Sequence, residues 1–149
     1  MKKTLFLFLA AGLIYACKKD NIGSKPMVSF KSYSADSITP ETQQFNVTLR
    51  VEDGDGDIED SIWLAILIKS QQEVSKDTLW GKYKMPGIGQ NRGNRIKADV
   101  ILGLQQEHFA FNYTARPNDS AHFVTYLRDS RGNISDTIAT PIFPFRRNQ

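Results

Sequence analysis

The residue run with the clearest chemical potential is acidic and spans residues 52–60, where six of nine side chains are carboxylates. Such density repels itself unless water or a cation screens it. Asp53, Asp55 and Asp57 alternate with glycines, so a tight loop can turn three carboxylates toward one point. Calcium prefers about six to eight oxygen ligands, mostly carboxylate and carbonyl. We therefore weigh two interpretations, a calcium site and a solvated turn that discourages edge-to-edge aggregation.

The spacing of these aspartates resembles the Asp-x-Asp-x-Asp beginning of EF-hand and dockerin loops. It departs from an EF-hand at Ile58, where that loop needs glycine, and at Leu64, where it needs glutamate. The run is more similar to an Asp-Gly-Asp-Gly-Asp segment that follows the second strand of a β-domain in many uncharacterised Bacteroidota lipoproteins. That resemblance implies a position in a fold and no biochemical role.

Familiar catalytic motifs are absent from the sequence. It contains no Gly-x-Ser-x-Gly, no His-Glu-x-x-His and no phosphate-binding loop. His108 and His122 are the only histidines, and without paired ligand spacing we interpret both as structural. A glycosidase needs two carboxylates about 5–10 Å apart across a cleft. Asp99 or Glu107 could be recruited for that role, but nothing in the pattern marks them, so the sequence favours a protein that is not an enzyme.

The elements that would position the acidic run are β-strands. Alternating or continuous apolar runs, separated by turns rich in Gly, Pro, Asn and Asp, predict eight candidate strands and no helix longer than about two turns after residue 25. The candidates are residues 27–33, 44–51, 62–68, 78–84, 95–102, 107–114, 122–127 and 134–142. This pattern favours one immunoglobulin-like antiparallel β-sandwich of about 7–8 strands. The side chains expected in its core are Phe45, Val47, Leu49, Trp63, Ile66, Val100 and Tyr126.

The closing segment, residues 126–135, resembles the last hairpin of many bacterial immunoglobulin-like domains, where an Asp-x-x-Gly-Asn turn joins the final two strands. In such a sandwich the loops after the second strand and before the last strand lie at the same end. That layout would bring Asp129 to the acidic run as a fourth calcium ligand. It requires two strands between the central apolar strand and this turn, whereas three candidates are present. Either two of them form one bent strand, or one is irregular, or Asp129 lies at the far end.

Residues 1–16 have the features of a signal peptide. Two lysines precede 12 residues without charge, which is too short for a bilayer-spanning helix of about 20 residues. The segment Ile14-Tyr15-Ala16-Cys17 resembles the lipobox of bacterial lipoproteins. This resemblance implies cleavage before the cysteine, diacylglycerol on its thiol and an acylated amine, with chains such as palmitate. The chain has a single cysteine, so Cys17 is the expected lipid attachment site.

The residues after Cys17 indicate a compartment. Lys18-Lys19-Asp20-Asn21 resembles the start of many mature Bacteroidota lipoproteins, and a lysine instead of an aspartate at this position favours the outer membrane. Whether the protein faces the periplasm or the cell surface stays open. The expected organisation is a signal peptide at 1–16, a lipidated cysteine and flexible tether at 17–25, the β-sandwich at 26–145 and a polar tail at 146–149.

The charge balance argues against a nucleic-acid partner. The chain has 19 basic and 16 acidic residues, and two of the lysines leave with the signal peptide. The mature chain is therefore close to neutral and has no electrostatic footprint for nucleic acid. We expect a non-catalytic envelope module that binds a protein or glycan partner through its loops, with calcium binding at the acidic run and a solvated turn both left open. The alternative is a small enzyme or an accessory subunit of polysaccharide capture, for which Trp80, Tyr83 and Phe111 are the candidate sugar-binding aromatics.

Overall fold

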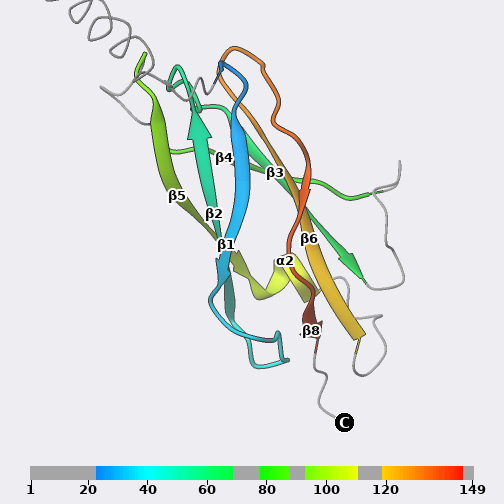
Figure 1. Cartoon of the computed structure of the whole chain (residues 1–149). Helices are drawn as coiled ribbons and strands as arrows, with labels where there is room; N and C mark the ends of the chain where they lie inside the picture. The colour runs from blue at the N-terminus through cyan, green and yellow to red at the C-terminus, as the bar shows by residue number, and fades with distance from the viewer. Residues whose placement is uncertain (1–22, 69–77, 88–92, 111–118, 146–149) are drawn as a thin grey trace, which may run out of the picture.

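The computed structural model describes residues 23–68, 78–87, 93–110 and 119–145 (Figure 1). This part of the chain contains eight strands and one short helix. In chain order they are β1 (Met27–Tyr33), β2 (Gln44–Asp53), β3 (Ser61–Ile68), β4 (Gly81–Lys84), β5 (Ile96–Gln105), α2 (Gln106–Ala110), β6 (Asp119–Arg128), β7 (Ile138–Ala139) and β8 (Phe143–Phe145).

The strands form two antiparallel sheets that pack against each other (Figure 1). One sheet has the order β1-β2-β5, and the other has the order β4-β3-β6-β7 with β8 also paired to β6. The predicted all-β antiparallel sandwich is therefore confirmed. In constant-type immunoglobulin domains the fourth strand joins the sheet of the first, second and fifth. Here β4 pairs with β3 and so belongs to the opposite sheet.

Strand β2 explains why the acidic run begins inside the fold. Its side chains alternate between core and solvent, and Phe45, Val47 and Val51 are completely buried. Residue 53 has the same parity, so Asp53 lies on the core side and is 0 % exposed. The predicted strand 44–51 is confirmed and extended by two residues. Its last residue places a carboxylate at the edge of the apolar core.

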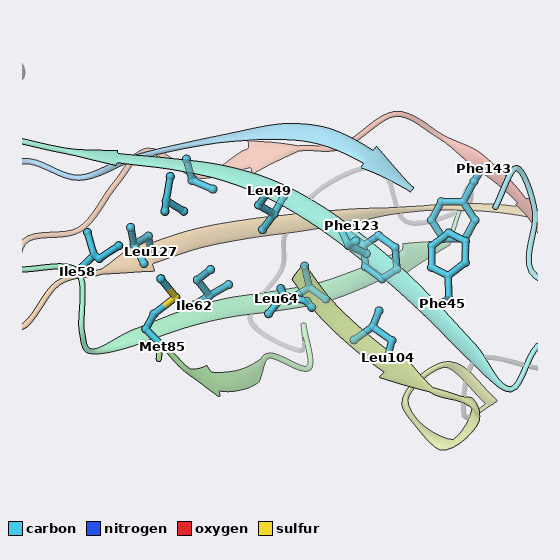
Figure 2. Close-up of a cluster of buried hydrophobic side chains, with 14 of the residues drawn as sticks. Phe45, Leu49, Ile58, Ile62, Leu64, Met85, Leu104, Phe123, Leu127 and Phe143 are labelled. Carbon is cyan, nitrogen blue, oxygen red and sulfur yellow. The ribbon is translucent and has the colours of Figure 1, made fainter. Parts of the chain in front are cut away.

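The core is aromatic at one end, where Phe45, Phe123 and Phe143 lie together (Figure 2). Tyr33 of β1 completes this group, which we call the aromatic end, and its ring centroids lie 5.2–6.2 Å apart. Tilted and offset rings at this spacing add to the stabilisation that comes from buried apolar area. Toward the other end of the cluster the core is aliphatic and reaches Ile58 in the acidic run.

The last strand is interrupted at Thr140. β7 pairs with the middle of β6, and β8 pairs with its beginning. Between them the Thr140 hydroxyl accepts the backbone N–H of Phe123 at 2.8 Å, in place of a backbone carbonyl. The Tyr33 hydroxyl lies 2.5 Å from Thr140 Oγ1 and 2.7 Å from the carbonyl oxygen of Pro141. This contact links the first and last strands across the two sheets.

The outer face of the β4-β3-β6-β7 sheet carries the indole of Trp63. Its neighbours Ile62 and Leu64 point into the core, so strand parity turns Trp63 outward. There it stacks on Tyr126 of β6 with ring centroids 5.9 Å apart. The prediction that Trp63 and Tyr126 are largely buried in the core is wrong, because both are only partly buried and lie on the outer face of the sheet. The other two predicted core residues of intermediate burial, Ile66 and Val100, do pack against the core.

The strand predicted at 107–114 is wrong over its described part, because Gln106–Ala110 forms the helix α2. The physical reason is a local hydrogen bond: Nδ1 of His108 accepts the backbone N–H of Gln105 at 3.0 Å, which bends the chain out of β5. Glu107 and His108 are exposed, so no apolar alternation holds this segment in a sheet. Residues 111–118 lie outside the described residues.

The remaining strand predictions differ mainly at their ends. β1 has the predicted bounds, and β4 begins three residues later than expected. Within the segment predicted at 134–142 only the two residues of β7 form a strand, and β8 follows after its end. α2 has five residues, which agrees with the expectation of short helices. Among the described residues, no helix is long and apolar enough to cross a bilayer.

Candidate metal centre

Two loops meet at the end of the sandwich where β2 and β6 finish. Only β4 and β5 lie between β3 and β6 in the described part of the chain, which resolves the strand count in favour of a common end. The backbone N–H of Ser130, in the loop after β6, donates to the carbonyl oxygen of Asp57 at 2.8 Å. The N–H of Gly93 donates to the carbonyl oxygen of Asp55, also at 2.8 Å. Both contacts fix the acidic loop, and we call this end of the sandwich the acidic end.

Asp53, Asp55 and Asp57 converge as the sequence pattern predicts. Each offers a carboxylate oxygen, and these oxygens lie within 4.8 Å of one another. The loop is folded back on itself because the N–H of Asp57 donates to Oδ2 of Asp53 at 2.9 Å. Gly56 makes this turn possible with a φ of 66°, a conformation that costs glycine little.

Several oxygens of this group have no hydrogen-bond donor. Oδ1 of Asp53, Oδ1 of Asp55 and both carboxylate oxygens of Asp57 are buried without a hydrogen bond. Asp53 is 0 % exposed and Asp57 is 6 % exposed, so solvent screens them poorly. Buried polar groups in folded proteins are almost always paired, and an unpaired buried charge is costly. The group is therefore a set of oxygen acceptors of the kind that could hold a metal ion.

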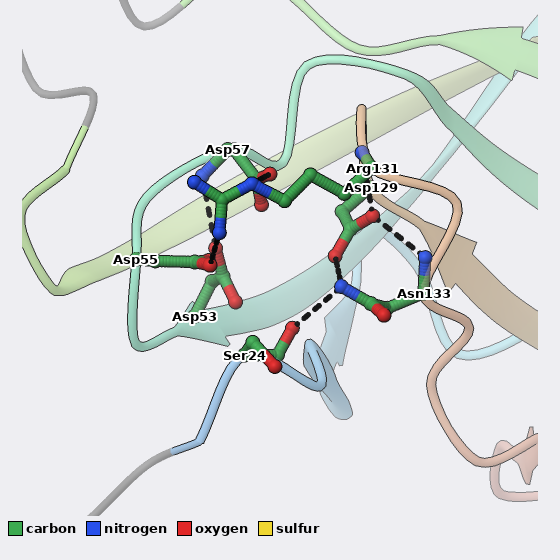
Figure 3. A network of polar contacts seen from close by, with 7 residues as sticks. All are labelled: Ser24, Asp53, Asp55, Asp57, Asp129, Arg131 and Asn133. Atoms are coloured by element: carbon green, nitrogen blue, oxygen red, sulfur yellow. Dashed lines mark hydrogen bonds and ion pairs between the residues drawn. The ribbon is translucent and has the colours of Figure 1, made fainter.

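Arg131 is the positive charge that approaches this group (Figure 3). Its Nη1 donates to Oδ2 of Asp55 at 2.5 Å, and its Nε lies 3.1 Å from Oδ2 of Asp57 without hydrogen-bond alignment. The guanidinium supplies one charge against three carboxylates. Negative charge consequently remains uncompensated at the acidic end.

Asp129 lies beside the three aspartates but uses its oxygens to build its own turn. Oδ1 accepts the N–H of Arg131 at 2.9 Å and that of Asn133 at 2.8 Å. Oδ2 accepts the side-chain amide of Asn133 at 2.7 Å. Gly132 has a φ of 89°, as expected for the Asp-x-x-Gly-Asn turn. Asp129 is therefore placed at the predicted end, outside the set of three converging carboxylates.

Burial and the closeness of several carboxylates change the pKa values of this group. Burial raises the pKa of Asp53. Burial, followed by the charges of Asp129 and Asp55, raises the pKa of Asp57 to about 6. Each carboxylate makes ionisation of its neighbours less favourable. Protons therefore compete with any cation for these oxygens in mildly acidic solution.

Sequence reasoning missed three participants at this end. Arg131 approaches the carboxylates, Asn133 braces Asp129, and the carbonyl oxygen of Ser24 accepts the Asn133 side-chain amide at 3.1 Å. A usable signal was present, because Arg131 and Asn133 belong to the predicted turn that also holds Asp129. Cys17, the predicted lipid attachment residue, lies outside the described residues.

The other residues considered for catalysis or sugar binding are dispersed. Asp99 lies on the outer face of β5, where Lys31 and Arg50 pair with it and lower its pKa. Glu107 is exposed on α2. Tyr83 packs against the core cluster, whereas Trp80 contacts Tyr126 at a centroid distance of 5.1 Å. Phe111 lies outside the described residues.

Comparisons with known proteins do not place this chain in a family. No protein-family model matches the sequence, and no curated protein matches it. Among solved structures, the chain is similar to the sporulation control protein Spo0M from Bacillus subtilis, with 14 % identity and a TM-score of 0.40. The match covers 85 % of this chain and 51 % of that one, so the chain spans about half the length of that structure. The strand order itself shows that the described part of the chain is an antiparallel β-sandwich.

Proposed function

We propose that the chain is a non-catalytic lipoprotein of the cell envelope, anchored in the outer membrane through Cys17. Its sandwich binds calcium at the acidic end and a protein or glycan partner through its loops. The observation that carries this proposal is the set of buried carboxylate oxygens without donors in Asp53, Asp55 and Asp57. Three carboxylates without a nitrogen or sulfur ligand suit a hard cation.

Calcium fits this set better than magnesium. Magnesium demands a near-ideal octahedron of short bonds, whereas calcium accepts irregular oxygen shells completed by backbone carbonyls and water. Calcium sites of extracellular modules have dissociation constants of about 0.1–1 mM. An affinity in that range requires an environment rich in calcium, which is consistent with an exported protein.

The position of the tether supports anchoring close to the acidic end. Lys25 forms an ion pair with Asp136 at 2.6 Å, and the carbonyl of Ser24 bonds to Asn133 in the turn that holds Asp129. A fully extended chain from Cys17 to Lys25 reaches at most about 29 Å. In a lipidated protein the acidic end would therefore lie close to the membrane, with the opposite end directed outward.

Calcium binding is tested by titration calorimetry of the full chain in detergent. We expect one site with a dissociation constant of about 0.1–1 mM for calcium and weaker binding of magnesium. Asp55→Asn should abolish the calcium signal. Asp60→Asn is the matched control, because Asp60 belongs to the same acidic run but pairs with Arg128 at 3.5 Å. Equal responses to the two ions, or no response in millimolar calcium, would contradict the proposal.

Anchoring is tested by replacing the only cysteine of the chain. Cys17→Ser should leave the precursor uncut at that position and prevent incorporation of labelled palmitate. Detergent phase partition then separates the anchored wild type from the variant. A variant that is still processed and still partitions with membranes would exclude lipid attachment at Cys17.

A role in polysaccharide capture is the second candidate, favoured by the aromatic side chains on the outer sheet face. Trp63 stacks on Tyr126, Trp80 meets Tyr126 edge to face, and the Lys82 ammonium lies 5.5 Å from the Trp63 ring centroid. Partly exposed indoles of this kind bind sugar rings. Affinity electrophoresis in polysaccharide gels should show retardation of the wild type that Trp63→Ala removes. Equal mobility of the two proteins in every gel would exclude this surface.

A further inference from the structure

We infer that Arg131 is the resident counter-ion of the acidic end and that calcium takes its place when it binds, so that Arg131 sets the affinity of the site. This inference rests on the proposed calcium binding. Arg131 occupies the position that a bound cation would need, because it already contacts two of the three converging carboxylates.

Arg131 contacts one carboxylate oxygen of Asp55 and one of Asp57. Nη1 lies 2.5 Å from Oδ2 of Asp55, and Nε lies 3.1 Å from Oδ2 of Asp57. Asp53 is the third member of the group and receives no contact from the guanidinium, while its Oδ1 stays unpaired. One guanidinium thus satisfies part of the acceptor set and leaves the rest for a cation of higher charge.

The backbone of Arg131 is held by hydrogen bonds of the turn, whereas its side chain is largely exposed. Its backbone N–H donates to Oδ1 of Asp129 at 2.9 Å, and the neighbouring N–H of Gly132 donates to the carbonyl oxygen of Asp129 at 3.1 Å. These bonds fix the Cα of Arg131 in the turn. Its side chain is nevertheless 64 % exposed and reaches the carboxylates from the solvent side. The side chain is therefore largely in solvent already, apart from its contacts with Asp55 and Asp57.

Calcium and the guanidinium exclude each other at this position. Both would neutralise the same carboxylates of Asp55 and Asp57, and two cations at that separation repel each other strongly where burial lowers the dielectric. A doubly charged ion also compensates more of the negative charge than one guanidinium does. Calcium entry consequently requires that Arg131 leaves, and the cost of breaking its two ion pairs weakens calcium binding.

The test compares calcium affinities by titration calorimetry of the full chain in detergent. Replacement of the competitor in Arg131→Gln should tighten calcium binding about 10-fold, a coupling of ordinary size between two competing ligands. Arg128→Gln is the matched control, because Arg128 lies next to the same turn and pairs with Asp60 outside the group. The control removes the same charge and should change the affinity less than about twofold, as expected for screened surface charges.

A second measurement follows the arginine in the wild-type protein. The Nε–Hε resonance of Arg131, assigned by its loss in Arg131→Gln, should move toward the position of a free arginine as calcium is added. Unchanged or weaker binding in Arg131→Gln, or a resonance that stays in place at saturating calcium, would overturn the inference while the wild type still binds calcium. Absence of calcium binding in both proteins would instead overturn the proposed function and this inference with it.

Discussion

The aromatic end and the acidic end of the sandwich differ in how their buried polar groups are paired. At the aromatic end, the one polar group among the rings, the Tyr33 hydroxyl, contacts Thr140 Oγ1 and the carbonyl oxygen of Pro141. At the acidic end, four buried carboxylate oxygens of Asp53, Asp55 and Asp57 have no donor. The aromatic end pairs its polar group within the described chain, whereas the acidic end leaves carboxylate oxygens unpaired, and we propose calcium as their ligand.

This difference indicates which end of the molecule is stabilised by apolar contacts and which end depends on charge. The aromatic end is stabilised by apolar contacts that carry no charge and bind no ion, so its stability should not depend on millimolar calcium or on pH near neutrality. The acidic end carries like charges in a poorly solvated place, so its contribution changes sign with protonation and with cation binding. We therefore expect that mutations at the two ends respond differently to calcium and to pH.

The largest expected effect comes from the aromatic end. Phe45→Ala should lower the free energy of unfolding by about 3–5 kcal/mol, because it removes a buried ring and leaves a cavity. Denaturation in urea measures this loss, which should be equal with calcium and with chelator. Leu79→Ala is the control, since Leu79 is 91 % exposed and its truncation should change little. A loss at residue 45 that calcium repairs would break the distinction between the two ends.

The next largest effect is expected at the acidic end. Replacing Asp57 should raise stability without calcium and remove most of the stabilisation that calcium provides. In chelator, Asp57→Asn should raise the melting temperature, because the variant removes one of several crowded buried charges. In calcium the wild type should gain about 1.4 kcal/mol at ten times the dissociation constant, and the variant should lose most of that gain. Differential scanning calorimetry in the two buffers measures both signs. A variant that is less stable in chelator would mean that the ionised carboxylate stabilises the fold by itself.

A smaller effect is expected where the aromatic end holds its polar group. Tyr33→Phe removes the hydroxyl that contacts Thr140 Oγ1 and the carbonyl oxygen of Pro141, and should cost about 1 kcal/mol. Urea denaturation measures it, and calcium should not alter it. A cost well above that of Phe45→Ala would show that the hydroxyl contact, and not ring burial, dominates this end.

The smallest effect concerns pH and follows from the raised pKa of Asp57, which is about 6. The folded state binds this proton more tightly than the unfolded state, so the ion-free protein should become less stable as the pH rises through 6. Calcium binding should change in the opposite sense, with affinity falling about twofold between pH 7 and pH 6 as protons compete. Titration calorimetry at both values measures the change. A calcium affinity that does not vary over this range would exclude Asp57 as a ligand.

The sequence was informative wherever side chains alternate. The pattern from Phe45 to Val51 identifies β2 and its core face, and the same parity carried forward places Asp53 inside the fold. The apolar run 62–68 has no alternation, so it indicates a buried strand without indicating which face Trp63 occupies. Its outward position becomes visible only from the pairing with β4 and β6.

The candidate site was partly predictable for a related reason. Convergence of Asp53, Asp55 and Asp57 follows from local spacing, since a short glycine-containing loop brings them together. The contact of Arg131 with Asp55 joins residues 76 positions apart, and local pattern carries no information about such a pair. The role of Asp129 was ambiguous because a carboxylate can build a turn or bind an ion, and only the bonds to its own turn distinguish the two.

The interruption of the last strand at Thr140 has a consequence for amide hydrogen exchange. The Phe123 amide, in the middle of the central strand β6, is protected by a side-chain hydroxyl and not by a neighbouring backbone carbonyl. The exchange rate of the Phe123 amide therefore depends on whether the Thr140 hydroxyl stays in place. Because β7 and β8 pair with β6 separately, β8 can open without β7, and exchange at its end of β6 should be faster than at the β7 pairing. We therefore expect β8 to open as its own small unit, which requires the ring of Phe143 to leave the core.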